Sequence, residues 1–391
     1  MDFTNLKIFM EHMSDKYTPG NVVEVFYGGK SVYRYASGFA DIESKTAMCG
    51  DEMFNIYSCS KIATVTAGIQ LLERGQFLLN EPLYEYIPEF KEMNIKLPTG
   101  EIVKANNFIT IGDLFTMTAG FSYSFNTEGF RKAYGITNGK METVEVIKCI
   151  ASDPIFFEPG THWQYSICHD VLAALISVVS GMKFRDYVME NIFLPLGMTE
   201  SVYHHTKETL VKTASQYIFM PENLEKIDLV EMQKAGKAKM GMFEKIGKDN
   251  PHILGEEYDS GGSGIITTVS DYIKLIAALA NWGKGINGER ILSKNAVELM
   301  RTNRLTLEQQ KDFNWKQLAG CGYGLGVRTH IEPNKSGLIC NKGEFGWGGA
   351  AGATAIIDPQ INLAVFYAQH MLNPREDYYQ PRLRNVIYSC L

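Results

Sequence analysis

Ser58 and Lys61, three residues apart, are the pair in this sequence best suited to nucleophilic chemistry. Small and apolar residues recur at helical intervals from Ala63 to Leu72. This predicts a helix with Ser58 at or near its N-terminus and Lys61 one turn later on the same face. Backbone N–H groups at a helix N-terminus can bind an oxyanion, and a lysine one turn away can take up the hydroxyl proton if burial lowers its pKa. Ser58 is therefore a candidate nucleophile.

Spacing alone does not decide the role of Ser58. The same Ser-x-x-Lys spacing occurs at Ser180 and Lys183, but Ser180 ends an apolar run and precedes Gly181, a pattern typical of a helix C-terminus. Ser58 could also be a helix N-cap beside a solvated lysine, because serine is a preferred N-cap residue. Cys59 is a second candidate nucleophile, but no lysine stands three residues after it.

The composition indicates a globular protein. The chain has 391 residues, of which 45% are hydrophobic and 12% aromatic, enough for a large buried core. The net charge is −6 and no Lys/Arg block stands out, which argues against nucleic acid or an anionic membrane as a partner. The N-terminus carries acidic residues and no sustained apolar core, so we expect no signal peptide and a cytoplasmic location. The oligomeric state is left open.

Neither a metal nor a cofactor is expected. Seven scattered cysteines without a Cys-x-x-Cys pair favour free thiols in a reducing compartment. His204 and His205 are adjacent, so they would point to opposite sides of a strand or lie in a loop, and no helically spaced carboxylate completes a ligand set. The Gly-rich segment 259–264 has no Walker Lys-Ser/Thr, which favours close backbone approach over a phosphate cradle.

Strand patterns occupy both ends of the chain and helix patterns its middle. This is typical of an α+β fold in which an antiparallel sheet is flanked by helices and carries an inserted, mainly helical domain. We assign residues 1–57 and 265–391 to the sheet domain and residues 58–264 to the inserted one, with the site near their seam. The predicted strands cover residues 22–27, 31–39, 323–331, 338–342, 353–358 and 363–369, and the predicted helices residues 5–14, 58–75, 111–120, 143–152, 171–179, 184–191, 270–283 and 379–390.

Two further segments lie in the second half of the inserted region. A hairpin is predicted from residues 215–220 and 226–230, with its turn at Pro221-Glu-Asn. The lysine-rich segment 233–248 is expected to be a solvated, mobile excursion.

Three motifs follow one another along the chain: Ser58-Cys-Ser-Lys61, Tyr165-Ser-Ile167 and Trp347-Gly-Gly349. Together they resemble the motifs of the serine β-lactamase and penicillin-binding protein superfamily, in its class C β-lactamase-like esterase branch. The second motif stands in the place of the superfamily's Tyr-x-Asn, and the third in the place of its Lys-Thr-Gly or His-Thr-Gly. The stretches 116–121, 158–160, 261–264 and 270–272 are also similar, so the resemblance covers nearly the whole chain.

The resemblance implies a role for each matching residue. Ser58 would attack a carbonyl carbon and become acylated, Lys61 would accept or share its proton, and Tyr165 would act as general base and then general acid. Whether Lys61 or Tyr165 is the base stays open. A tyrosine serves as a base at neutral pH when a neighbouring cation stabilises its phenolate. The N–H groups of Ser58 and Ala350 would form the oxyanion hole, worth about 3 kcal/mol per donor.

The departures from the superfamily pattern bear on the substrate. Trp347 replaces the cation that pairs with a substrate carboxylate in β-lactam and peptidoglycan enzymes. Ile167 replaces the asparagine of the second motif. Ile167, Trp347, Gly348 and Gly349 are therefore candidate substrate-binding residues that favour a neutral, apolar acyl group, although Trp347 could simply pack in the core.

A Ser-His-Asp triad with His169 and Asp170 is not favoured. Both lie at the predicted start of the helix that follows Tyr165, where a structural capping role fits better. No Gly-x-Ser-x-Gly elbow occurs, which argues against an α/β-hydrolase. We therefore expect a serine hydrolase that forms an acyl-enzyme, most simply an esterase acting on small apolar acyl esters. The alternatives are a weak β-lactamase or D-amino-acid peptidase acting on an amide, and a penicillin-binding protein without efficient turnover.

Overall fold

The computed structural model describes residues 1–219 and 243–391, and its largest element is an antiparallel sheet of eight strands in the order β10, β11, β12, β13, β14, β1, β2 and β3. Strands from the two ends of the chain meet where β14 pairs with β1. The strand bounds are β1 Gly20–Tyr27, β2 Lys30–Asp41, β3 Thr46–Ala47, β10 Cys321–Tyr323, β11 Arg328–His330, β12 Phe345–Gly346, β13 Thr354–Asp358 and β14 Leu363–Gln369.

The hairpin of β1 and β2 shows why the sequence forms this sheet. Tyr27 pairs with Lys30 across a two-residue turn in which Gly28 and Gly29 both have positive φ, at 60° and 82°. Such a turn matches the twist of the flanking strands, and glycine adopts it without steric cost. The predicted hairpin is therefore confirmed.

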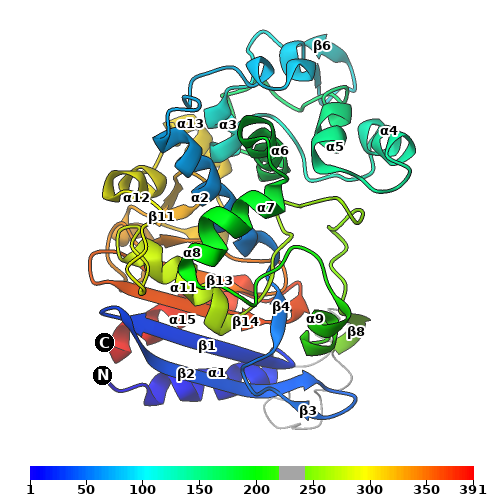
Figure 1. Cartoon of the computed structure of the whole chain (residues 1–391). Helices are drawn as coiled ribbons and strands as arrows, with labels where there is room; N and C mark the ends of the chain where they lie inside the picture. The colour runs from blue at the N-terminus through cyan, green and yellow to red at the C-terminus, as the bar shows by residue number, and fades with distance from the viewer. Residues whose placement is uncertain (220–242) are drawn as a thin grey trace.

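Helices cover both faces of the sheet (Figure 1). Helix α1 (Thr4–Lys16) packs with α15 (Glu376–Cys390) on one face, and α11 (Val269–Ala280) covers the other. Alternate residues of β1 serve the two faces: Val23 joins the core under α1 and α15, whereas Val22 belongs to the main core on the opposite side. The predicted α+β architecture is confirmed.

The middle of the chain is mainly helical and lies beyond α11, away from the sheet (Figure 1). Its central helix α2 (Ser60–Glu73) is buried from Ser60 to Leu71 and packs against α6 (Cys168–Ser180). The division into a sheet domain and an inserted domain stays a prediction. The other helices here are α3 Ile111–Thr116, α4 Glu128–Ile136, α5 Thr143–Ile150, α7 Phe184–Val188, α8 Leu194–Leu196 and α9 Lys207–Lys212, and the later ones are α12 Lys294–Arg301, α13 Leu307–Asp312 and α14 Pro333–Ser336.

Small sheets connect these parts. Strand β4 (Met53–Asn55), which leads directly to Ser58, pairs with β9 (Ile266–Thr268). Strand β5 (Asn94–Lys96) pairs with β6 (Ile102–Lys104). Strand β7 (Gln216–Phe219) lies between β8 (Phe243–Gly247) and β15 (Met371–Leu372).

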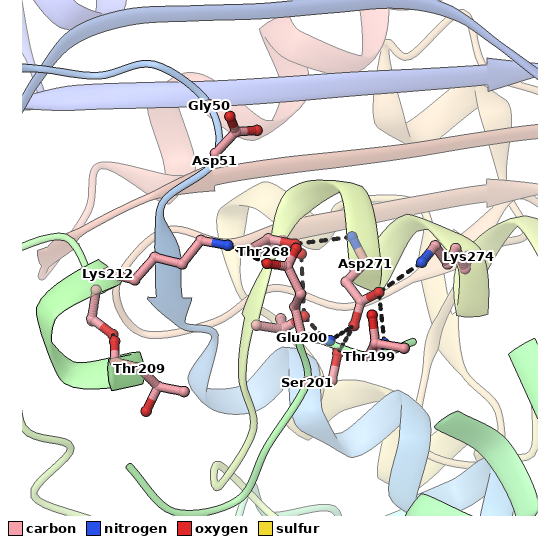
Figure 2. A network of polar contacts seen from close by, with 12 residues as sticks. Gly50, Asp51, Thr199, Glu200, Ser201, Thr209, Lys212, Thr268, Asp271 and Lys274 are labelled. Atoms are coloured by element: carbon pink, nitrogen blue, oxygen red, sulfur yellow. Dashed lines mark hydrogen bonds and ion pairs between the residues drawn. The ribbon is translucent and has the colours of Figure 1, made fainter. Parts of the chain in front are cut away.

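A polar network fixes the start of α11 (Figure 2). The carboxylate of Asp271 accepts hydrogen bonds from the N–H groups of Thr199 and Glu200, at 3.2 and 2.8 Å, and from the Ser201 hydroxyl. Thr268, at the end of β9, caps the same helix. Because β9 pairs with β4, this network also supports the strand that delivers Ser58.

Several predicted boundaries are wrong. Residues 338–342 form no strand; the sheet takes β12 instead, which is two residues long and pairs with β11 and β13. Helix α3 ends at Met117, with φ of 61°, and not at Gly120. Of the segment predicted to be a solvated excursion, residues 243–247 form β8, where Lys245 pairs with Asp41 and Glu43. The predicted strand at residues 226–230 lies outside the described residues.

Three observations concern membrane spans, cysteines and metal sites. Within the described ranges, no helix has the length and apolarity needed to cross a membrane. All seven cysteines are free. Over the same ranges, no three His, Cys, Asp or Glu side chains gather where they could hold a metal ion.

Candidate active site

Ser58 lies in a tight turn between β4 and α2. Residues Tyr57–Cys59 form one turn of 3-10 helix, and Tyr57 has φ of 45°, a strained conformation for a large side chain. Two contacts hold that side chain: its hydroxyl donates to Gln216 at 2.6 Å, and its ring meets the edge of His252. Contacts with the distant residues Gln216 and His252 therefore hold Tyr57 in its strained conformation, and this turn places Ser58 at the start of the helix.

Lys61 and Tyr165 both reach the Ser58 hydroxyl. The Tyr165 hydroxyl donates to Ser58 Oγ at 2.5 Å, and Lys61 Nζ donates to the same atom at 3.2 Å. Lys61 is fully buried and donates a second hydrogen bond to the carbonyl of Gly262, at 2.7 Å. Tyr165 stands three residues before α6, as its motif predicted. The three residues singled out in the sequence thus meet at one oxygen atom.

Lys61 keeps its proton. Burial alone would lower the pKa of the ammonium group, but the phenolic groups of Tyr123 and Tyr165 and the carboxylate of Asp170 outweigh it and raise the pKa above its ordinary value. Nζ lies 4.7 Å from the ring centre of Tyr165 and 5.3 Å from that of Tyr123. Burial does act to lower this pKa, but the neighbouring groups outweigh it, so the condition under which Lys61 could take up the serine proton is not met.

Asp170 and His169 neither cap a helix nor touch Ser58. Asp170 is buried and its Oδ1 accepts hydrogen bonds from the hydroxyls of Ser260, at 2.7 Å, and Tyr258. His169 is buried against the carbonyl of Phe115, and burial drives the pKa of its ring well below the ordinary value. The predicted capping role is wrong, because both side chains turn inward from α6.

The glycine-rich turn shows the close backbone approach that the sequence predicted. A Cβ on Gly262 would lie 2.6 Å from Asp170 Oδ2 and 3.3 Å from Lys61 Nζ. No side chain fits there without displacing one of these charges. Glycine therefore lets the backbone carbonyl reach the buried lysine.

Trp347 is both a core residue and a neighbour of the reactive group. It is buried, its ring stacks on Tyr165 with centroids 5.6 Å apart, and it meets the ring of Tyr323 edge-on. Its Nε1 also donates a long hydrogen bond to the Tyr165 hydroxyl, at 3.4 Å. The sequence predicts only an apolar surface from Trp347, whereas its indole N–H also makes a polar contact with Tyr165.

The residues after Trp347 continue β12 alongside β13. Trp347 accepts a hydrogen bond from the N–H of Ala355, and Gly348 bridges to Thr354. A Cβ on Gly349 would overlap the carbonyl oxygen of Ile56. The next residue, Ala350, is exposed, and its N–H has no hydrogen-bond partner among the described residues. This donor is available to a ligand.

A cavity of about 200 Å³ opens beside Ser58. Ile167 is not part of its wall. Ile167 is buried, donates its N–H to the carbonyl of Ser122 and lines a separate cavity with Phe121 and Phe130, so its place does not support a substrate-binding role. The wall is formed by Ser58, Tyr165, Trp315, Gln317, Leu318, Arg328, Trp347, Gly348, Gly349, Ala350, Glu376 and Gln380.

Sequence reasoning missed part of this wall. Trp315, Glu376 and Gln380 come from segments with no motif, and the C-terminal helix begins at residue 376, three residues earlier than predicted. The one available signal was the spacing of Glu376, Gln380 and Arg384, which places three polar side chains on one face of a helix at four-residue intervals.

The comparisons with known proteins agree with this geometry. The sequence model of the Beta-lactamase family matches residues 7–388. The chain belongs to the β-lactamase family. As a member of this family with esterase relatives, it is a serine hydrolase, and the superfamily expected from the three motifs is confirmed.

Three proteins illustrate the range of this β-lactamase family around the chain. Protein Rv1367c of Mycobacterium tuberculosis is 27% identical over 358 residues, covering 89% of this chain and 84% of that protein. Esterase EstB of Burkholderia gladioli is 26% identical over 369 residues, covering 92% and 87%. The solved structure of EstCE1, described as a hydrolase with promiscuous acyltransferase activity, superimposes with a TM-score of 0.76 at 22% identity and covers 98% of this chain and 97% of that one.

Proposed function

We propose that this β-lactamase-family hydrolase is an esterase that forms an acyl-enzyme on Ser58 with small, largely apolar acyl esters. The observation that carries the proposal is the convergence of the Tyr165 hydroxyl and the Lys61 ammonium on Ser58 Oγ, at 2.5 and 3.2 Å. EstB, a relative over most of the chain, is named an esterase, which supports the same choice. A base candidate, a fixed cation and an open cavity are the components that nucleophilic catalysis by a serine needs.

In the proposed first half-reaction, Ser58 Oγ attacks the ester carbonyl carbon and its proton passes to the oxygen of Tyr165. The Lys61 ammonium lies 4.7 Å from the Tyr165 ring centre and Trp347 Nε1 donates to the phenolic oxygen, so a cation and an N–H donor lie beside the atom that accepts this proton. The N–H groups of Ser58 and Ala350 hold the negative oxygen of the tetrahedral intermediate. The intermediate then expels the alcohol, which takes the proton from Tyr165.

In the second half-reaction, water attacks the acyl carbon and gives one proton to Tyr165. The C–O bond to Ser58 breaks, the acid leaves, and the serine hydroxyl takes the proton back. Because Lys61 stays charged, it stabilises both intermediates without moving a proton itself. This assigns the base role to Tyr165.

The neutral Trp347 argues for esters over β-lactams, since no cation from that motif faces the cavity to pair with a substrate carboxylate. Steady-state turnover of p-nitrophenyl acetate, p-nitrophenyl butyrate and nitrocefin tests this choice. We expect turnover of the esters by the native chain, none by Ser58→Ala, and native turnover by Ser180→Ala. The control removes the serine of the second Ser-x-x-Lys pair, whose hydroxyl donates to the carbonyl of Ile176 and accepts from the N–H of Met182. Nitrocefin turned over far faster than the esters would contradict the substrate class.

A further inference from the structure

Two polar side chains in the cavity beside Ser58 take no part in the steps above. Glu376 lies in the first turn of α15 and Gln380 one turn later, and both line the cavity. A Cβ on Gly348 would lie 3.4 Å from Glu376 Oε1 and 2.7 Å from Gln380 Nε2. The two side chains therefore reach the backbone of the Trp347-Gly-Gly349 motif, next to the proposed oxyanion hole.

One oxygen of Glu376 is held and the other is open. Oε2 accepts a hydrogen bond from Gln317 Nε2, at 3.1 Å. Oε1, the atom nearer Gly348, has no partner among the described residues. The residue is partly exposed, and because it lines the cavity its open surface faces the space beside Ser58. An open hydrogen-bond acceptor therefore lies in a cavity wall that also contains the aromatic rings of Tyr165, Trp315 and Trp347.

The charges behind this wall favour a neutral donor over a cationic one. Arg328 is buried and paired through two hydrogen bonds with Glu344, at 2.7 and 2.5 Å. Arg384, also buried, has no hydrogen-bond partner at Nε or Nη1, and its Nε lies 3.8 Å from Glu344. One carboxylate therefore faces two guanidinium groups, and the charge of Arg384 also acts to lower the pKa of the Glu376 carboxyl, against the larger effect of burial. A substrate cation would add a third positive charge.

We propose that Glu376 is a specificity-determining residue that accepts a hydrogen bond from a neutral hydroxyl group of the substrate. The preferred esters then carry a hydroxyl within reach of α15, on the acyl or on the alcohol part, and are not purely apolar. This inference rests on the proposed esterase function and names the substrate class of the same site. Burial raises the pKa of the Glu376 carboxyl to about 7, so both of its protonation states are present near neutral pH and both can accept from a hydroxyl.

Matched ester pairs test the proposal on both parts of the substrate. For the acyl part, p-nitrophenyl 3-hydroxybutyrate is compared with p-nitrophenyl 3-methylbutyrate, which replaces the hydroxyl by a methyl group. For the alcohol part, 2-hydroxyethyl butyrate is compared with propyl butyrate. We expect a preference of roughly tenfold in kcat/KM for the hydroxyl member of one pair, because a hydrogen bond to a charged or polar acceptor contributes about that much.

The variants separate specificity from folding. Glu376→Leu should abolish the preference, and Glu376→Gln, which keeps an acceptor oxygen and the side-chain volume, should retain part of it. Asp377→Asn, a change at the exposed neighbouring residue of α15, should keep it in full. Equal rates within both pairs, a preference that survives in Glu376→Leu, or a 3-aminobutyrate ester that outpaces the hydroxyl ester would overturn the proposal. Failure of the native chain to turn over any of these esters would instead remove the proposed function itself.

Discussion

The Cα of Gly349 packs against the carbonyl oxygen of Ile56, so closely that a Cβ at this position would overlap it. Ile56 stands two residues before Ser58, and Gly349 one before Ala350. The contact therefore sets the distance between the two N–H groups that we assign to the oxyanion hole. The segments that carry Ile56 and Gly349 are far apart in the sequence, and they can approach this closely because glycine has no side chain.

This contact predicts that Gly349→Ala impairs catalysis. The added methyl group must push the strand end away from Ile56, and misplaced oxyanion donors typically cost about 10²-fold in kcat. The rate with p-nitrophenyl butyrate measures this loss. Gly135→Ala is the matched control, because a Cβ there meets nothing within 4 Å and the position lies on α4. Unchanged kcat in Gly349→Ala would contradict the assigned oxyanion hole.

Tyr165→Phe is predicted to lower kcat by about 10²- to 10⁴-fold, because the phenolic oxygen is the proposed proton carrier. The ring contacts with Trp347 stay in place, so the melting temperature should change little. Enzyme kinetics and thermal unfolding on the same preparation check both statements. Tyr134→Phe, at an exposed position, is the control. A Tyr165→Phe variant with near-native kcat would assign the base role elsewhere.

We predict that substituting Asp170 offsets the loss of stability caused by removing Lys61, but does not restore the activity. Lys61→Met removes the cation from a fully buried site and leaves Asp170, whose Oδ2 has no partner, without a counter-charge. The two groups interact through charge without a direct ion pair, so we expect a loss of about 1–3 kcal/mol in the free energy of unfolding, the cost of leaving a buried polar group uncompensated. The double variant Lys61→Met with Asp170→Asn should recover much of that loss in urea unfolding and still show no esterase activity. Additive losses in the double variant would argue against this coupling.

The raised pKa of Glu376 predicts a pH-dependent stability. The folded carboxyl titrates at about 7, against an ordinary value of 4.5, because burial disfavours its charged form. Between these values the folded state holds a proton that the unfolded state has lost, so this group's contribution to stability falls as pH rises through the window. Glu376→Gln has no such contribution. Its melting temperature relative to the native chain should therefore be higher at pH 8 than at pH 5.

The sequence allowed the reactive residues to be predicted, because their signals are local. Ser58 and Lys61 are linked by helical spacing, and Tyr165 precedes a helix start, so one turn of chain fixes each side chain's direction. Trp347 was found by its motif, but its hydrogen bond to Tyr165 depends on how β12 approaches α6 and is not encoded in either segment alone.

The rest of the site depends on contacts between distant segments. Burial alone would lower the pKa of Lys61, but the pKa rises because Tyr123 and Asp170 lie beside it, from segments more than 60 and 100 residues away in the sequence. Glu376 joins the cavity only because α15 packs beside the end of β12. Ile167 was placed in the site by its motif, but it faces a different cavity. Tertiary packing decides these three cases, and no local pattern reports it.

Covalent trapping tests the central claim most directly. The native chain is incubated with a fluorophosphonate, digested, and the labelled peptide is sequenced by mass spectrometry, with Ser58→Ala and Ser180→Ala treated in parallel. We predict a single adduct on Ser58 that is lost in Ser58→Ala, is kept in Ser180→Ala and is absent from Ser60, which is buried and accepts a hydrogen bond from Ile265. No adduct on the native chain, or an adduct that persists in Ser58→Ala, would contradict the claim that Ser58 is the nucleophile.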